Sequence, residues 1–179
     1  ESGVNTPDEF EPQRRVAGGL DAVLRADELF DPVRLVIDPV TGCPACPVPM
    51  GVFTAGSWML YIPEDQADSV QLIVSPREVD PLNHGAADRW MAYYGKVRSA
   101  RFAIFEIEMY KRMDVAVSGE EARLAHPFRS QETAICREAT AQQEALRGAC
   151  ARLSGASPDE VRAVGVDPYG LDVKVRFGV

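Results

Sequence analysis

The alternation of apolar and polar residues predicts β-strands through most of the first two thirds of the chain. Near residue 107, Phe105, Ile107 and Met109 alternate with Glu106 and Glu108, which is typical of a long strand with one face in water. Strands are expected at residues 33–37, in two extended segments within 46–63, at 69–76, and within 100–117, where a second strand is expected to begin near residue 114.

Apolar residues spaced three and four apart predict helices in other stretches. Short helices are expected within residues 18–30 and, after a turn, within residues 78–97. The strongest helical pattern spans residues 130–155, and Gly155 is expected to end that helix. A Ser-Pro pair at 157–158 predicts one more helix start.

The last part of the chain predicts a β-hairpin, because two alternating segments, "VRAVGVD" and "LDVKVRFGV", flank the turn-forming "DPYG". The chain shows no repeated βαβ spacing and no glycine-rich phosphate loop. The element order therefore predicts an α+β fold, a mainly antiparallel sheet or small barrel followed by a helix and β-hairpin subdomain. We expect a flexible tail over 1–17, the barrel-like domain over 18–118 and the subdomain over 119–179.

Composition and charge narrow the classes of function. The 179 residues are 46% hydrophobic, enough for a substantial core. The formal charge of −8 argues against nucleic acid as the main partner, because binding phosphates requires a basic surface. No apolar run reaches the length of a membrane span, so no membrane association is expected. Four cysteines are too sparse for a disulfide scaffold, which favours the cytoplasm, although the chain does not begin with Met and a removed signal peptide stays open.

The stretch "VIDPVTGCPACPVPM" holds Cys43 and Cys46 in a C-x-x-C arrangement. We interpret it as a tight turn, since Asp-Pro followed by Gly three residues later suits a turn. A redox or metal site is the alternative, but structural zinc usually needs four ligands, and Cys136 and Cys150 are expected far apart on one helix. The prolines lack N–H donors, so the second half of the stretch is expected to be an edge or irregular strand.

Residues 88–101 contain the densest group of basic and aromatic side chains. The candidate ligand-binding residues are Arg89, Trp90, Tyr94 and Arg98, because flat aromatic faces and cations suit a planar anionic ligand. In the alternative interpretation, Trp90 and Tyr94 lie one helical turn apart in the core, and the cations are solvated.

Two histidines and two glutamates are further candidates. His84 precedes the aromatic helix and His126 precedes the long helix, and each could ligate haem iron or act as a general base. His84 is the better placed of the two as a metal ligand, and a hydrogen-bonding role is the alternative for both. Glu106 and Glu108 share a strand face, which permits a paired acid site or, alternatively, an exposed polar face.

The segment "VRAVGVDPYGLDVKVRFGV" resembles the closing hairpin of the small C-terminal domain of haem-utilisation proteins in the FMN-binding split-barrel superfamily. The matching features are the apolar run 164–166, Asp167, the Gly170 turn and a strand ending in Arg176-Phe177. The segment "VRLVIDPVTGCPACPVPM" is similar to the first hairpin of that barrel, and "RWMAYYGKVRSARFAIFEIEMYKRMDV" is similar to the strand that passes near its ligand.

The resemblance could cover residues 30–179. It implies that the fold is an antiparallel split β-barrel followed by a helix and β-hairpin subdomain, and that the chain forms a homodimer with ligand sites at the subunit interface. It supports a leading hypothesis: binding of haem or FMN, with haem handling or weak oxidoreductase activity, at Arg89, Trp90, Tyr94 and Arg98. The second hypothesis is a cofactor-free regulatory or protein-interaction module. It is favoured by residues 58–76, which contain acidic residues but none of the cations with which such barrels bind flavin phosphate.

Overall fold

The structure, a computed structural model, describes residues 20–26, 29–54, 56–63, 68–97, 101–123, 127–167 and 170–177. The chain divides into two compact units, residues 1–125 and residues 126–179, which are described separately. The predicted tail over 1–17 lies outside the described residues.

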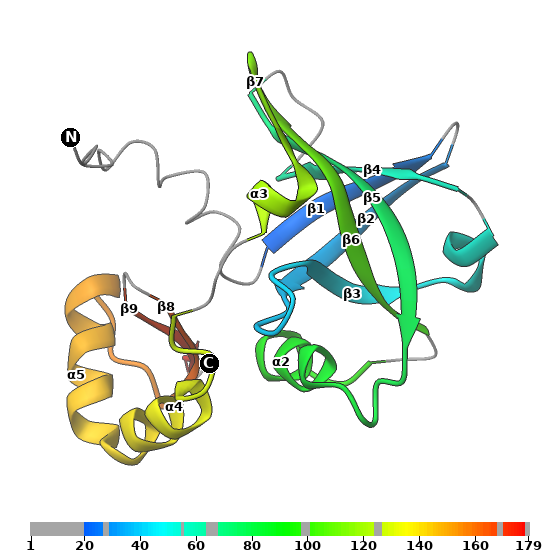
Figure 1. Cartoon of the computed structure of the whole chain (residues 1–179). Helices are drawn as coiled ribbons and strands as arrows, with labels where there is room; N and C mark the ends of the chain where they lie inside the picture. The colour runs from blue at the N-terminus through cyan, green and yellow to red at the C-terminus, as the bar shows by residue number, and fades with distance from the viewer. Residues whose placement is uncertain are drawn as a thin grey trace. The chain divides into compact units, whose positions relative to one another are not determined.

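The first unit is built around a closed, six-stranded antiparallel barrel (Figure 1). Its strands are β1 (Leu20–Ala26), β2 (Leu29–Ile37), β3 (Pro44–Val48), β4 (Trp58–Ile62), β5 (Val70–Val79) and β6 (Arg101–Arg112). The strand order is β3-β2-β1-β4-β5-β6, and pairing between β3 and β6 closes the barrel. The remaining elements are a 3-10 turn η1 (Met50–Thr54), α2 (Gly85–Tyr94), β7 (Val115–Ser118) and α3 (Gly119–Ala122). The predicted α+β class, with an antiparallel barrel, is confirmed.

Apolar side chains fill the barrel interior. Along β4 and β5 buried and less buried residues alternate, as expected when one strand face points inward. The largest fully buried apolar side chains come from every part of the barrel and include Leu24, Leu35, Leu60, Leu72, Phe102, Ile104 and Phe105. A six-stranded barrel filled in this way has a packed interior, so any ligand site must lie on its outside.

The long strand β6 is shared between two partners on one of its edges. Its first part, at Arg101–Ile104, pairs with β3, and its last part, at Met109–Arg112, pairs with β7. Between them α3 begins directly after β7 and packs against β6. A Cβ atom on Gly119 would lie 1.7 Å from the carbonyl oxygen of Ile107, so the approach of α3 to β6 requires glycine at this position.

Two predictions for the first unit are wrong. The predicted helix within 18–30 is β1 followed by the start of β2, because β1 lies between β2 and β4. Three consecutive residues, Ala22, Val23 and Leu24, are buried there, so both faces of the strand carry apolar residues and imitate helical spacing. The proline-rich segment is not an edge strand, since β3 pairs with both β2 and β6.

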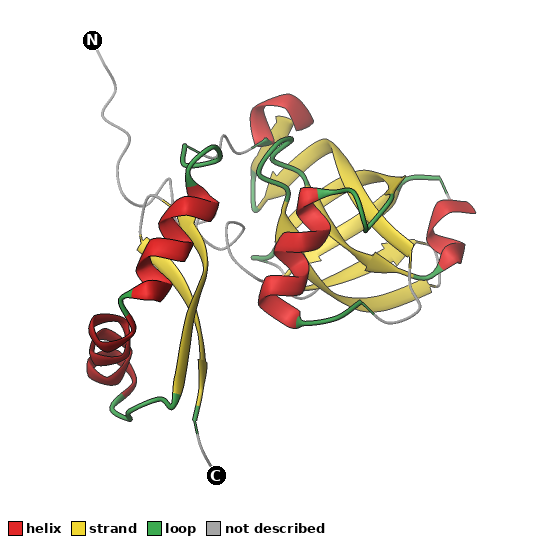
Figure 2. Ribbon diagram, turned by 90° about the horizontal axis from the view of Figure 1, so that it is seen from below, coloured by secondary structure: helices red, strands yellow, loops and turns green. Residues whose placement is uncertain are grey.

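The second unit contains α4 (Glu132–Ala141), α5 (Gln143–Ser154) and the hairpin of β8 (Glu160–Asp167) and β9 (Gly170–Arg176) (Figure 2). The single helix predicted over 130–155 is wrong, because the chain breaks at Gln142, where φ is −86° and ψ is 54°. Gly155 ends α5 in the left-handed conformation, as predicted. The helix start predicted at 157–158 is absent; Pro158 is buried and leads into β8.

Candidate functional site

Three of the predicted ligand-binding residues, Arg89, Trp90 and Tyr94, lie on α2. This helix packs on the outside of the barrel against β2 and β3 (Figure 1). The helix begins after His84, whose ring Nδ1 accepts a hydrogen bond from the backbone N–H of Ala86 at 3.2 Å. Ala86 and Ala87 are fully buried, and their small side chains let the helix approach the sheet closely. The position of α2 explains why β3 is buried on both faces.

Side-chain hydrogen bonds from Trp90 and Tyr94 connect α2 to the backbone of β2. The indole Nε1 of Trp90 donates to the carbonyl oxygen of Arg34 at 2.7 Å, and the hydroxyl of Tyr94 donates to that of Leu35 at 3.0 Å. Their ring centroids are 5.1 Å apart. Burial, together with the nearby Asp21 carboxylate, raises the pKa of Tyr94 to about 12, so the hydroxyl remains a donor at neutral pH. The polar atoms of both rings therefore hold α2 to the barrel, whereas the two residues as a whole are only half-buried.

Two arginines stand over the tyrosines of this helix. The guanidinium of Arg34 lies 5.7 Å from the ring centroid of Tyr94, and that of Arg89 lies 5.5 Å from the ring centroid of Tyr93. Both distances are within the range of cation–π attraction. Arg34, Arg89, Trp90, Tyr93 and Tyr94 are called the α2 aromatic cluster below.

The α2 aromatic cluster contains three of the four predicted ligand-binding residues, and Arg98 lies outside the described residues. Arg34, which sequence reasoning missed, comes from a strand far away in the chain. It also contacts the carboxylate of Asp21 at 3.4 Å on the exposed face of β1. Nothing in the local pattern around Arg34 distinguishes it from any other exposed strand arginine.

The hydrogen bond at His84 determines what this side chain can offer a metal. A neutral imidazole has one nitrogen lone pair, and here that lone pair, on Nδ1, accepts the N–H of Ala86. The proton of the neutral ring is therefore on Nε2. Ligation of iron by Nε2 would require the ring to change tautomer and release the helix cap. The second histidine, His126, lies outside the described residues.

Cys43 and Cys46 lie at and just after a tight turn, as interpreted from the sequence. The backbone N–H of Asp38 donates to the carbonyl oxygen of Cys43 at 2.8 Å, and the Asp38 carboxylate accepts from the backbone and hydroxyl of Thr41. Both thiols are buried, and burial raises the pKa of the Cys46 thiol far above its usual range. A thiol held protonated in this way is a poor nucleophile and a poor metal ligand.

Each of the paired glutamates on β6 has a partner on β5. Glu106 forms an ion pair with Arg77 at 2.9 Å, and Glu108 accepts a hydrogen bond from Ser75. These contacts lie on the solvent side of the barrel. The arrangement is that of an exposed, cross-strand polar face.

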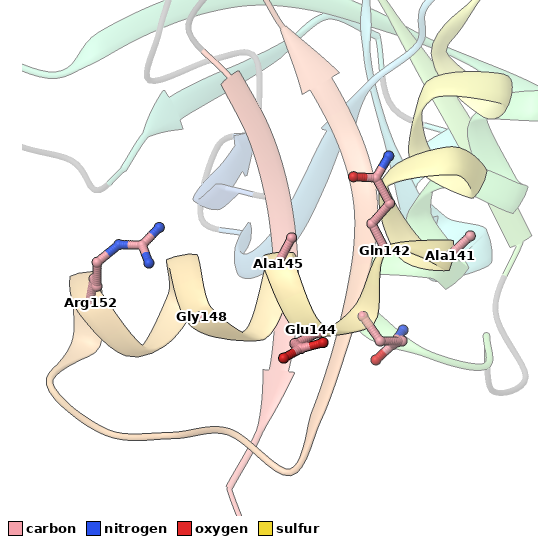
Figure 3. Close-up of a pocket in the computed structure, with 7 residues that line it drawn as sticks. Ala141, Gln142, Glu144, Ala145, Gly148 and Arg152 are labelled. Atoms are coloured by element: carbon pink, nitrogen blue, oxygen red, sulfur yellow. The ribbon is translucent and has the colours of Figure 1, made fainter.

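The second unit has a shallow depression of about 700 Å³ where α4 meets α5 (Figure 3). It is lined by Ala141, Gln142, Gln143, Glu144, Ala145, Gly148 and Arg152. The side chain of Gln143 is engaged in the fold, since its Nε2 donates to the carbonyl oxygens of Thr140 and Val161. None of the predicted site residues lines this depression.

Within the described residues, no three or more His, Cys, Asp or Glu side chains gather in a way that could hold a metal ion. No helix in the described part of the chain is both long and apolar enough to span a bilayer.

Comparisons with known proteins relate the fold to solved structures. No protein-family model matches the chain, and no curated protein matches it. A protein of unknown function from Agrobacterium tumefaciens str. C58 superposes with a TM-score of 0.66 at 16% identity, over 97% of this chain and 87% of that chain. A haem-binding protein from Mycobacterium smegmatis superposes with a TM-score of 0.44 at 18% identity, over 96% and 85% of the two chains. The first likeness supports the fold of the whole chain.

Proposed function

We propose that the protein binds a planar, anionic cofactor, haem or FMN, on the outside of the barrel at the α2 aromatic cluster. The observation that carries the proposal is the cluster itself. Trp90, Tyr93 and Tyr94 all lie on α2 with half-buried rings, and the guanidinium groups of Arg34 and Arg89 lie over two of them. Because the barrel interior is filled, this surface is the one on which the predicted residues can meet a ligand.

The chemistry of the cluster suits both cofactors in the same way. A macrocycle or an isoalloxazine ring would stack on the half-buried aromatic faces, and a propionate or phosphate would pair with a guanidinium. Arg34 is the accessible cation, with a side chain 64% exposed, whereas Arg89 is only 8% exposed. Arg98 completes the proposed set. When bound, haem or FMN would supply the redox chemistry itself, while the protein would bind and orient the cofactor.

A titration of the full chain with haem, and separately with FMN, followed by absorption, tests the proposal. Arg34→Gln is expected to weaken binding about tenfold, the loss typical of one charge-assisted contact. Arg25→Gln is the matched control, since it removes the same charge from an exposed position. Arg34 pairs with Asp21 near the start of β1, whereas Arg25 lies near the end of that strand. Equal affinities for the two variants, or no binding of either cofactor by the wild type, would refute the proposed site.

The role of His84 as an iron ligand is tested by two substitutions that separate capping from ligation. His84→Asn keeps a side-chain oxygen that caps α2 but cannot replace the imidazole on iron, whereas His84→Ala removes both functions. If His84 ligates iron, both variants lose the haem spectrum of the wild type. If it serves only as a cap, His84→Asn retains that spectrum.

The second candidate, a cofactor-free protein-interaction module, is favoured by the β6–β7 hairpin. Met109, Met113 and Val115 are exposed there, and β7 pairs only with β6 among the described residues. An exposed apolar strand edge is a common feature of association surfaces, including those of homodimers. A wild-type chain that binds neither haem nor FMN but whose mass in solution falls on Val115→Asp would support this candidate over cofactor binding.

A further inference from the structure

The β8–β9 hairpin of the second unit has one apolar face that is covered unevenly. On β8, Val161, Ala163 and Val166 are buried beneath α4 and α5. Their cross-strand neighbours on β9 are Val175, Val173 and Leu171. Leu171 and Val175 are each 39% exposed, and Phe177, which follows β9, is 43% exposed.

The helices of this unit cover the outer edge of β8. The backbone N–H of Ala163 donates to Thr140 at 3.0 Å, and that of Val166 donates to the carboxylate of Glu132 at 3.3 Å. The carbonyl oxygen of Val161 accepts from Gln143. In the described residues β9 pairs only with β8, so its outer edge has no strand partner there.

The contacts on β8 also fix the direction of the backbone groups of β9. In an antiparallel pair, two opposed residues either both direct their N–H and C=O toward each other or both direct them away. Val161 and Ala163 direct theirs away from β9, toward the helices. Their partners Val175 and Val173 therefore direct theirs out of the open edge of β9.

We propose that this edge pairs with the same edge of a second copy of the chain, antiparallel, with Val173 opposite Val173 of the partner subunit. Charge complementarity between the two copies of β9 supports this pairing. In this register, Asp172 lies opposite Lys174 of the partner subunit, and by symmetry Lys174 lies opposite Asp172 of the partner subunit. Leu171 lies opposite Val175 of the partner subunit on the apolar face. Opposite charges are therefore paired on one face of the new sheet, and apolar side chains are paired on the other.

Neighbouring registers do not achieve this complementarity. The two β9 strands can hydrogen-bond only where residues with outward-directed N–H and C=O groups lie opposite each other. The nearest alternative registers are therefore those in which the two-fold axis passes through Asp172 or Lys174 instead of Val173. A centre at Asp172 places two aspartates opposite each other, and a centre at Lys174 places two lysines opposite each other. The register centred on Val173 is the one of the three that brings no like charges together.

The pairing creates a four-stranded antiparallel sheet across a two-fold axis, β8-β9-β9-β8. It extends the apolar faces of the two β9 strands into one surface. It uses a different surface from the α2 aromatic cluster and does not depend on cofactor binding.

Disulfide trapping of the full chain tests the register, in a background with Cys136→Ser and Cys150→Ser. Val173→Cys is expected to form a dimer in oxidised glutathione, because directly opposed Cα atoms lie about 5.5 Å apart, within reach of a disulfide. Lys174→Cys is the matched control on the same edge. In the proposed register its two copies lie roughly 8 Å apart, too far for a disulfide. Equal cross-linking of both variants, or of neither, overturns the proposal.

Charge exchange tests the complementarity separately. Asp172→Lys or Lys174→Asp alone places like charges opposite each other and is expected to weaken cross-linking through Val173→Cys about tenfold. The double variant, Asp172→Lys with Lys174→Asp, recreates the pair with its signs exchanged and is expected to restore cross-linking. A double variant as weak as either single variant overturns the proposal, because the two charges would then only protect the edge.

Discussion

Replacing Gly119 by alanine is expected to destabilise the barrel unit strongly. The added Cβ would lie 1.7 Å from the carbonyl oxygen of Ile107 and 2.5 Å from its carbonyl carbon, whereas real Cβ contacts stay beyond 3.0 Å. Both obstacles are backbone atoms of the central strand β6 and cannot rotate away. Either α3 or β6 must therefore move by more than an ångström.

The size of the effect follows from what the movement breaks. Overpacking a well-packed site costs about 1–3 kcal/mol, and a clash with backbone is at the upper end of this range. The displacement also pulls on the capping box of α3, in which Ser118 and Glu121 bind each other's backbone. We expect a loss of about 3 kcal/mol in the free energy of unfolding.

Urea unfolding followed by tryptophan fluorescence measures this loss in the right part of the chain. The chain has two tryptophans, Trp58 and Trp90, and both belong to the first unit, so the signal reports the barrel alone. Gly85→Ala is the matched control. Its Cβ would meet nothing within 4 Å at the start of α2, so alanine is expected to stabilise the unit by about 0.5–1 kcal/mol. A Gly119→Ala barrel as stable as the wild type would refute the close approach of α3 to β6.

Three further predictions concern buried polar groups of the first unit. Thr41→Val removes the hydroxyl that donates to the buried carboxylate of Asp38 and is expected to cost about 1–3 kcal/mol in urea unfolding. Tyr94→Phe removes the hydrogen bond to Leu35 and is expected to cost about 1 kcal/mol at neutral pH. Because folding raises the pKa of Tyr94 to about 12, its contribution is complete below pH 10 and is lost as the pH rises through 12; the variant should lose less stability over that range. Cys46 should resist a thiol reagent in the native protein and react after unfolding, as read by mass spectrometry.

Each of these predictions has an opposing result. If the Thr41→Val barrel unfolds at the same urea concentration as the wild type, the hydrogen bond from the Thr41 hydroxyl to the Asp38 carboxylate does not contribute to stability. Stability profiles of wild type and Tyr94→Phe that stay parallel from pH 9 to pH 12 would contradict the burial of the phenol. Rapid labelling of Cys46 under native conditions would show that the turn opens readily.

The parts of the fold that sequence reasoning predicted are those where one strand or helix face meets water. The alternation of β6 was recognisable because Glu106 and Glu108 remain on the wet face opposite Phe105 and Ile107. β1 was mistaken for a helix because neighbouring elements bury consecutive residues, and a strand covered on both faces loses its alternation. β3 was mistaken for an edge strand because its prolines remove donors, yet β2 pairs with it at Pro44 and Ala45, and β6 pairs with it from Ala45 to Val48.

The sequence revealed only those residues of the candidate site that lie together on one helix, α2. Arg89, Trp90 and Tyr94 are close in sequence, so clustering along the chain revealed them. Arg34 joins them through tertiary packing, and the acceptors of Trp90 and Tyr94 are backbone carbonyls of β2, which no side-chain pattern announces. The break at Gln142 was missed for a similar reason, because the neighbouring Gln143 binds the distant carbonyl of Val161.

The pairing of β3 with β6 forms the seam that closes the barrel, and it affects how quickly the barrel folds. The other barrel ladders, except that between β1 and β4, join strands that follow each other along the chain, whereas the seam brings Ala45 to Ile104 across the intervening β4, β5 and α2. Closing so long a loop costs entropy before the new contacts can repay it. Barrel closure should therefore limit the refolding rate. A substitution at Ala103, on the seam, is then expected to slow refolding, whereas one confined to the β4–β5 hairpin changes mainly the rate of unfolding.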